Sequence, residues 1–174
     1  MAVLRPKKPI AIFSFRERNK KLFELKDKRK GLKEKPLMLA MCYGSDARNF
    51  IASNSLGEII VYDTKAYLPQ AYIKCSAPAT ALALSSNNYF IASAVGKNIV
   101  IWNFQTKEQR TSIPMPATVK EVAFSTDASL LAATTDDNRL TIIDTKNWEK
   151  VDIFDKLGGQ LTSPSFHPEG NGIR

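Results

Sequence analysis

The sequence repeats itself at an interval of 40 residues. Short apolar runs begin at Phe50, Phe90 and Leu130, and each is followed by a turn-forming group and then by a second apolar run. Self-similarity at this interval is typical of a protein built from copies of one folding unit. The repeat therefore constrains the fold more strongly than any single residue does.

The repeated unit is predicted to consist of four short β-strands. In the middle unit, four runs rich in Val, Ile, Leu, Phe and Tyr are separated by Gly, Asn, Asp, Ser and Pro, which favour turns. The first two runs of each unit are nearly continuous apolar sequence, as in strands buried on both faces, whereas residues 149–155 alternate, as in an exposed edge strand. These patterns predict a four-stranded antiparallel sheet with a buried inner edge and an exposed outer edge, which is the blade of a β-propeller. The runs of the middle unit cover residues 80–86, 89–94, 98–104 and 109–113.

Two segments carry a resemblance to a known family. Residues 124–144 resemble the first three strands and the tight turns of a WD40 blade, and residues 166–170 resemble the turn after the first strand of the next blade. The resemblance covers residues 37–170 and implies an all-β fold, a β-propeller of WD40-like four-stranded antiparallel blades. We also expect two glycines, Gly57 and Gly96, to supply the positive φ of tight turns.

The chain departs from the WD40 pattern at the family's most recognisable residues. The closing Trp-Asp pair is replaced by Tyr62-Asp63, Trp102-Asn103 and Ile143-Asp144, and no Gly-His dipeptide is present because His167 is the only histidine. We therefore expect the buried His-Ser-Asp-Trp hydrogen-bond network of the family to be missing. The blades of such a divergent propeller would be held mainly by strand pairing and apolar packing.

The strand runs divide the chain into five segments. Three of them are predicted to be complete blades, and the last segment is predicted to be the first strand of an incomplete further blade. Because a propeller closes with about four to eight blades, we expect the chain to be the N-terminal part of a longer propeller of about seven blades. A short open arc completed by a partner is the alternative. The segments are a basic arm at 1–36, blades at 37–75, 76–115 and 116–157, and the partial blade at 158–174.

The arm has two candidate structures. Residues 9–15 and 21–26 are similar to the third and fourth strands of a blade, so the arm would supply outer strands of the closing blade. Alternatively, the spacing of Phe15, Leu22 and Leu25 allows a basic amphipathic helix that ends at Gly31. We favour the strands, because Phe23 breaks the apolar stripe of the helix.

The arm also carries most of the positive charge. Residues 1–36 contain 13 Lys and Arg against 4 Asp and Glu, whereas the remaining residues contain 12 against 13. A field of this sign attracts phosphate groups, so RNA or DNA bound through residues 5–35 is one predicted partner. The simpler interpretation is a solvated outer strand whose lysines prevent edge-to-edge aggregation. The predicted phosphate-binding side chains are those of Arg16, Arg18, Lys20, Lys21, Lys28, Arg29 and Lys30.

Catalytic chemistry is not indicated. His167 lies in a turn sequence, and Cys42 and Cys75 fall in separate strands without ligand spacing, so we predict no enzyme activity, no metal site and no cofactor. No run approaches the roughly 18 apolar residues of a membrane span. Two strand-like cysteines favour a reducing compartment, so we expect a cytoplasmic protein, with the nucleus as the alternative.

The predicted function is a non-catalytic scaffold that binds other proteins in a multiprotein complex. The resemblance implies this function, because WD40 propellers present rigid loop surfaces to several partners. The alternative is an RNA-associated factor of ribonucleoprotein or ribosome assembly that uses the arm to contact phosphates. The predicted protein-interaction residues of the loops are Asp46, Arg48, Tyr67, Lys97 and Trp148.

Overall fold

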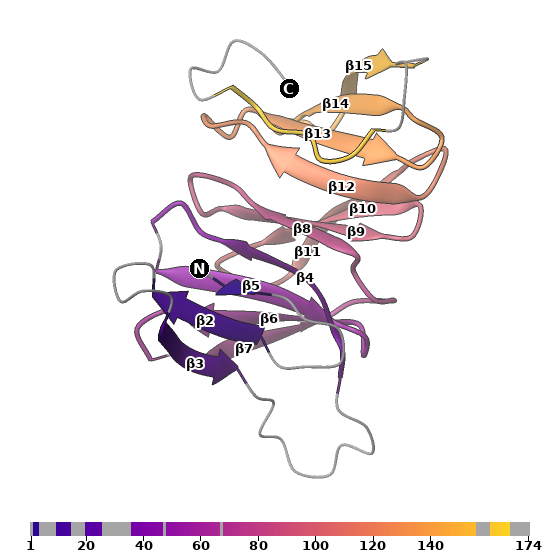
Figure 1. Cartoon of the computed structure of the whole chain (residues 1–174). Coiled ribbons are helices and arrows are strands. Elements are labelled where there is room, and N and C mark those ends of the chain that lie inside the picture. Colours follow the sequence, from indigo (N-terminus) through magenta and orange to yellow (C-terminus); the bar gives the residue numbers. More distant parts are fainter. Residues whose placement is uncertain are drawn as a thin grey trace.

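The protein consists of antiparallel β-sheets stacked on one another (Figure 1). In this computed structural model, all 15 described elements are strands, and they form one three-stranded and three four-stranded sheets. The described part of the chain contains no helix that is long and apolar enough to cross a membrane. The structure describes residues 2–3, 10–14, 20–25, 36–46, 48–66, 68–155 and 161–167, with only the backbone described up to residue 25.

Three short strands from the arm form their own sheet. They are β1 (Ala2–Val3), β2 (Ile10–Ser14) and β3 (Lys20–Leu25), and β2 pairs with both neighbours. The strand interpretation of residues 9–15 and 21–26 is therefore confirmed, and the amphipathic helix is wrong. The additional strand β1 was not predicted.

Each predicted repeat forms a four-stranded sheet in which neighbouring strands in sequence pair antiparallel. The first blade comprises β4 (Met38–Tyr43), β5 (Asn49–Asn54), β6 (Glu58–Asp63) and β7 (Pro69–Lys74). The second comprises β8 (Ala81–Leu84), β9 (Phe90–Val95), β10 (Asn98–Asn103) and β11 (Gln109–Pro114). The third comprises β12 (Val119–Phe124), β13 (Leu130–Thr135), β14 (Leu140–Asp144) and β15 (Lys150–Phe154).

The first and second blades bury an apolar layer between them. Ile51, Ile59 and Val61 of the first blade share a core with Ile91 and Trp102 of the second. Each fully buried aliphatic side chain of this kind stabilises the fold by about 1.5–3 kcal/mol. The layer therefore fixes the packing of one blade on the next.

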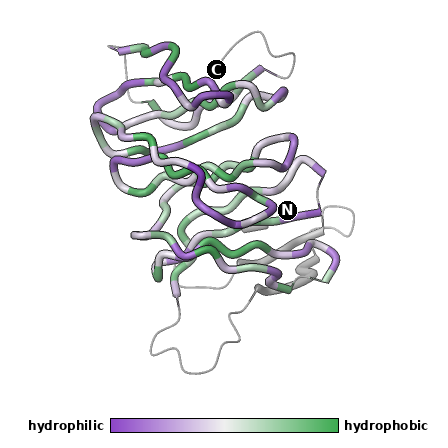
Figure 2. The backbone as a smooth tube through the Cα atoms, turned by 180° about the vertical axis from the view of Figure 1, so that it is seen from behind, coloured by the Kyte–Doolittle hydropathy of each residue, from purple (hydrophilic) through white to green (hydrophobic). Residues whose placement is uncertain are grey.

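A second apolar layer lies between the second and third blades. It contains Ile99 and Ile101 of the second blade together with Leu131 and Ile143 of the third. Because alternate residues of a strand point to opposite faces, neighbouring residues of β10 serve different layers. This explains why the inner strands are continuous apolar sequence. Figure 2 shows such hydrophobic stretches, in green, in the stacked strands.

The outer strands differ from the inner ones as predicted. In β7 and β11 one side chain each, Ile73 and Ile113, is buried, and in β15 all five residues are exposed. The expected exposed edge is thus confirmed. At the opposite end of the stack, the outer face of the first blade is covered. Phe50, Ile60 and Tyr62 lie on this face, away from the second blade, and they are nevertheless buried. Figure 1 places the sheet of β1–β3 at that end.

The structural repeat departs from the 40-residue interval in the first blade. Asn103 pairs with Phe90, but Asp63, the corresponding residue 40 positions earlier, pairs with Asn49. The structural counterpart of Phe50 is therefore Ile91. The cause is the turn between the second and third strands, which has three residues in the first blade (55–57) and two in the second (96–97).

The second blade retains part of the buried polar network that we expected to be missing. The Trp102 indole Nε1 donates a hydrogen bond of 2.9 Å to Ser93 Oγ, which donates one of 3.0 Å to the Val100 carbonyl. The expectation therefore needs correction for the Ser-Trp part of the network. A serine and a tryptophan in paired strands are enough to form this link without the histidine.

Candidate interaction surface

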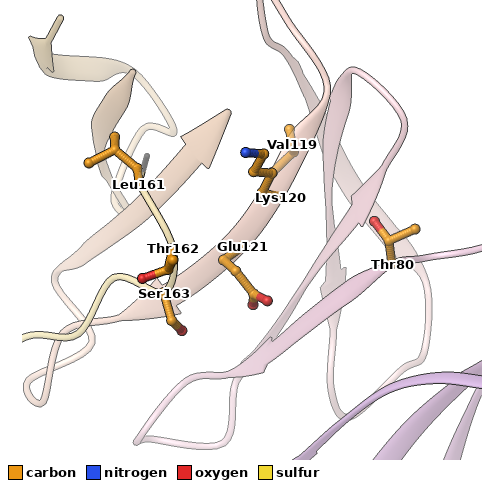
Figure 3. A pocket seen from close by; sticks show the side chains of 7 residues that line it. All are labelled: Thr80, Val119, Lys120, Glu121, Leu161, Thr162 and Ser163. Carbon is orange, nitrogen blue, oxygen red and sulfur yellow. The ribbon is translucent and has the colours of Figure 1, made fainter. Parts of the chain in front are cut away.

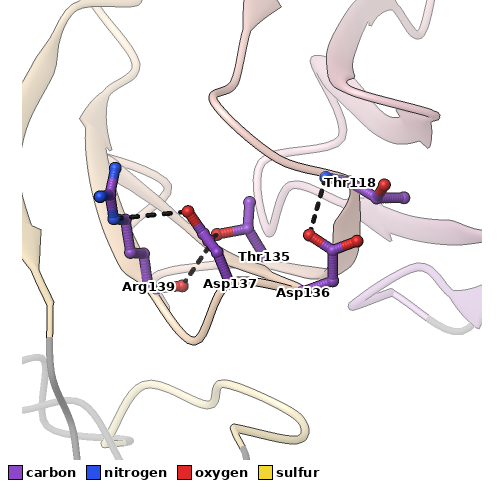
Figure 4. Close-up of polar contacts among 5 residues, drawn as sticks. All are labelled: Thr118, Thr135, Asp136, Asp137 and Arg139. Carbon is purple, nitrogen blue, oxygen red and sulfur yellow. Dashed lines mark hydrogen bonds and ion pairs between the residues drawn. The ribbon is translucent and has the colours of Figure 1, made fainter.

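The turns of the three blades gather at two opposite ends of the stack. In a four-stranded meander, the first and third turns lie at one end, and the second turn lies at the other with the link to the next blade. We call these the first-turn end and the link end. Hydrogen bonds between blades show that the ends are shared: Ser45 Oγ donates to the Ser86 carbonyl at 2.6 Å at the first-turn end. The Val119 amide of the third blade donates to the Gly96 carbonyl of the second at 2.9 Å at the link end. Within the third blade, the Thr118 amide donates to Asp136 Oδ1 at 3.1 Å (Figure 4).

The predicted loop residues are distributed over both ends. Asp46, Arg48 and Trp148 lie at the first-turn end, and the exposed Lys97 lies in the turn between β9 and β10 at the link end. They therefore do not form a single surface. Lys20 and Lys21 belong to β3, of which only the strand pairing is described. The other predicted residues, Arg16, Arg18, Lys28, Arg29, Lys30 and Tyr67, lie outside the described residues.

Acidic and amide side chains at the first-turn end cap their own turns. Asp46 Oδ1 accepts the Arg48 amide at 2.9 Å, and Asp63 Oδ1 accepts the amides of Lys65 at 2.8 Å and Ala66 at 2.6 Å. The corresponding residues of the other blades, Asn103 and Asp144, make the same bonds to the residue two positions later. The polar residue that closes each repeat is thus a turn cap.

Asp127 is the most strongly held of these caps. Its carboxylate accepts hydrogen bonds from Ser125 Oγ at 2.6 Å and from the Ser129 amide at 3.0 Å. These bonds, led by that of Ser125, lower the pKa of Asp127 to about 2. Asp127 therefore stays charged at neutral pH and caps the turn between β12 and β13.

Trp148 packs between blades and is not a free loop side chain. It has a left-handed backbone conformation with φ 64°, and its half-buried ring meets the Phe90 ring edge-on at a centroid distance of 5.0 Å. Among the described residues, its buried indole Nε1 has no hydrogen-bond partner. Lys107 occupies the equivalent turn position with φ 65°, and its ammonium lies 3.9 Å from the centre of the Phe104 ring.

Three exposed side chains that sequence reasoning did not select lie at the first-turn end. Tyr43, Leu68 and Tyr89 are 42%, 53% and 58% exposed, and we call them the aromatic rim. The Tyr43 ring packs at 5.0 Å on buried Phe50, and the Tyr89 ring lies 6.5 Å from that of Phe90. The sequence pattern does not distinguish them, because aromatic residues are expected in strands as well as at surfaces, and Tyr89 begins the predicted strand 89–94.

The turns at the link end follow the predicted chemistry. Gly57 and Gly96 have φ values of 73° and 59°, as expected for these turns. Asp137 accepts a 2.5 Å hydrogen bond from Thr135 Oγ1 and pairs with Arg139 Nε at 3.4 Å (Figure 4). The acidic pair of this turn thus has a structural role.

The cysteines behave as small core residues. Cys42 is half-buried, Cys75 is buried and both are free thiols. Burial raises the pKa of Cys42 to about 12 and that of Cys75 to about 11. Within the described ranges, no three or more His, Cys, Asp or Glu side chains are placed to hold a metal ion.

These observations define the fold: complete four-stranded antiparallel blades of a partial β-propeller, similar in architecture to WD40 repeat domains of known structure. The structure of U3-55K is similar, with a TM-score of 0.68 at 16% identity over 73% of this chain and 42% of that one. The RRP9 WD40 repeats match with a TM-score of 0.68 at 16% identity, over 73% and 41% of the two chains. Kuenenia stuttgartiensis hydrazine synthase matches with a TM-score of 0.74 at 15% identity, over 84% and 44%.

The similarity to these structures bears on the fold and leaves the activity open. This chain spans less than half the length of each of the three, and one of them is named as an enzyme. No family model and no curated protein matches the sequence.

Proposed function

We propose that this protein is a non-catalytic platform that binds protein partners of a multiprotein complex through its first-turn end. The observation that carries the proposal is the aromatic rim. Exposed tyrosines are common anchors of protein interfaces, because each offers a large apolar ring with one polar group. The WD40-type fold supports the proposal only by analogy.

Two contacts hold the backbone of the rim in place. Tyr43 rests on the buried ring of Phe50, and the 2.6 Å bond from Ser45 to Ser86 holds its turn against the turn that carries Tyr89. A side chain fixed as Tyr43 is loses little further conformational entropy when a partner binds. The rim therefore suits a protein with an apolar contact residue.

The charges around the rim limit the partner further. The carboxylates of Asp46, Asp63 and Asp127 are held by backbone amides of their own turns, so they are not free to rearrange toward a partner. Exposed Arg48 and Lys65 lie in the same turns. We infer that the partner contacts the rim chiefly through apolar and aromatic groups, with polar contacts at the edge.

The test compares two variants whose substituted tyrosines are similarly exposed but lie on different parts of the protein. Tyr43→Ser combined with Tyr89→Ser removes both rings of the rim, whereas Tyr72→Ser removes a ring that is 43% exposed on the outer strand β7. Partners that copurify from the native source are quantified by mass spectrometry after nuclease treatment. We expect the double variant to lose at least one stoichiometric partner that wild type and Tyr72→Ser retain.

Two controls make the result interpretable. The far-UV circular dichroism and melting temperature of the double variant show whether the blades remain folded. A photo-crosslinker at position 89 should capture the partner that the double variant fails to bind, and one at position 72 should not. Retention of all partners by a folded double variant would refute the first-turn end as the contact surface.

The charge of the arm supports a second candidate function. The excess of Lys and Arg in residues 1–36 is a composition typical of segments that bind phosphates. On this proposal the chain is an RNA-associated assembly factor, located in the cytoplasm or the nucleus. Charge reversal at Lys28, Arg29 and Lys30 should lower the affinity for labelled RNA and reduce the salt slope by about 0.7–0.9 for each phosphate that is no longer neutralised.

The matched control for the arm is reversal of three exposed lysines on the blades, Lys65, Lys97 and Lys146. It changes the net charge by the same amount at a different place. Equal reductions of affinity in both variants would mean unspecific attraction by net charge, which would refute a role of the arm.

A further inference from the structure

A cavity of about 540 Å³ opens at the link end, between the first strands of the second and third blades and residues 161–163 (Figure 3). Its lining residues are Glu121, the hydroxyl-bearing Thr80, Thr162 and Ser163, and Val119, Lys120 and Leu161. The cavity is wide open to solvent, so it suits a side chain or a small group that inserts from outside. The cavity lies at the opposite end from the aromatic rim.

Glu121 stands at a position where the other two blades have alanine. Strand pairing aligns the three residues. Glu121 pairs with Thr134, Ala81 with Ala94 and Ala40 with Ser53, and these three partners are equivalent positions of the second strand. Ala40 and Ala81 are buried, whereas Glu121 is exposed to the cavity. The repeat therefore requires only a methyl group here, and the carboxylate is not needed for blade packing.

Within the described part of the chain, the Glu121 carboxylate forms no hydrogen bond or ion pair. Its partial desolvation raises the pKa of Glu121. Figure 3 shows the Lys120 ammonium directed away from it, and the carboxylate lies between Thr80 and Ser163. The carboxylate is exposed and makes no contact with a cation among the described residues, so a cation that enters the cavity can reach it directly.

We propose that this cavity binds a cationic group, a guanidinium or a primary ammonium, through the Glu121 carboxylate. Charge-assisted hydrogen bonds between such groups and a carboxylate are roughly twice as strong as neutral ones. The hydroxyl oxygens of Thr80, Thr162 and Ser163 accept the remaining N–H donors. The cation is either an arginine or lysine side chain of a peptide or a free small amine.

The experiment is an NMR titration of the full ¹⁵N-labelled chain. The peptide-like probes are N-acetyl-arginine methylamide and N-acetyl-lysine methylamide, and the free amines are agmatine and cadaverine. N-acetyl-citrulline methylamide is the uncharged counterpart of the arginine probe. We expect the cationic probes to shift the amide signals of Glu121, Thr80 and Thr162 saturably, and citrulline to bind at least tenfold more weakly. The stronger of the two cationic sets identifies the source.

The variants separate binding from folding. Glu121→Gln keeps the shape of the side chain and should weaken the cationic probes at least tenfold, whereas Glu108→Gln, at the first-turn end, should leave their affinity unchanged. Glu121→Ala introduces the residue found at the other two positions, so its melting temperature should equal or exceed that of wild type. Wild-type affinity in Glu121→Gln, or equal binding of citrulline, would overturn the proposal.

Two further outcomes would also overturn it. If no cationic probe shifts the signals of the cavity, the carboxylate is not a binding group. If Glu121→Ala melts well below wild type, Glu121 contributes to packing. Neither outcome affects the proposed role of the aromatic rim, which lies at the other end of the stack and is tested by different variants.

Discussion

The buried hydrogen bond between Trp102 and Ser93 should show a measurable coupling energy. Ser93→Ala leaves the indole N–H of Trp102 without its 2.9 Å acceptor inside a core where Trp102 is buried. An unsatisfied buried donor costs about 1–3 kcal/mol, whereas the net contribution of a satisfied bond is about 1 kcal/mol. Trp102→Phe removes the donor itself and leaves a small cavity, so it should cost about 1–3 kcal/mol.

The double variant isolates the bond. Once Trp102 is phenylalanine, removing the Ser93 hydroxyl no longer leaves an orphaned indole N–H. The sum of the single effects should therefore exceed the effect of the double variant by about 1 kcal/mol. The measurement is urea unfolding followed by far-UV circular dichroism, because tryptophan fluorescence would change with the substitution itself.

Trp148 provides the matched control. Its indole N–H is buried without a partner among the described residues, so Trp148→Phe removes a similar aromatic group without removing a hydrogen bond. The cycle of Ser93→Ala with Trp148→Phe should be additive within about 0.3–0.5 kcal/mol. If the Trp102 cycle is also additive within this margin, the bond does not stabilise the second blade and the reasoning is refuted.

Three further predictions concern turns and thiols. Gly96→Ala should lower the free energy of unfolding by about 1–2 kcal/mol because of its positive φ, and Gly96→Asn by less, since Asn138 adopts φ 60° in the third blade; equal effects in urea unfolding would contradict this. The raised pKa of buried Cys75 should make its thiol react slowly with Ellman's reagent until the chain unfolds, and fast labelling of Cys75 in the native protein would contradict this. The same shift should make the free energy of unfolding fall as the pH rises above the ordinary cysteine pKa of about 9. The lowered pKa of Asp127 makes a stabilising contribution that is complete above the ordinary aspartate pKa and is lost as the pH falls toward about 2. Asp127→Asn should flatten this part of the plot of unfolding free energy against pH, and an unchanged plot would count against the capping role.

The strand content and the blade architecture could be predicted from the sequence, because they depend on local pattern. Continuous apolar runs such as 99–102 are needed wherever a strand has a buried layer on each face, and glycine at 57 and 96 is needed where the turn requires a positive φ. Both requirements concern residues that are close together in the sequence. The repeat at 40 residues then showed that the unit is copied.

The register of the first blade could not be predicted in the same way. The motifs at Phe50 and Phe90 are similar in sequence, yet the structural counterpart of Phe50 is Ile91. One extra residue in the turn at 55–57 shifts the pairing by one position, and a shift of one residue exchanges the two faces of a strand. Similar residues at a regular interval therefore do not always point to the same face of their blades.

The amino-acid pattern was enough to specify four-stranded antiparallel blades with turns of known type, because hydrophobic period and turn chemistry act between residues that are close along the chain. Which side chains meet depends instead on the packing of the sheets: Trp148 with Phe90, Tyr43 beside the turn of Tyr89, and Glu121 facing a cavity where its counterparts are alanines. These contacts join residues of different blades. Their geometry follows from how whole sheets stack, and the interval of a repeat contains no information about that stacking.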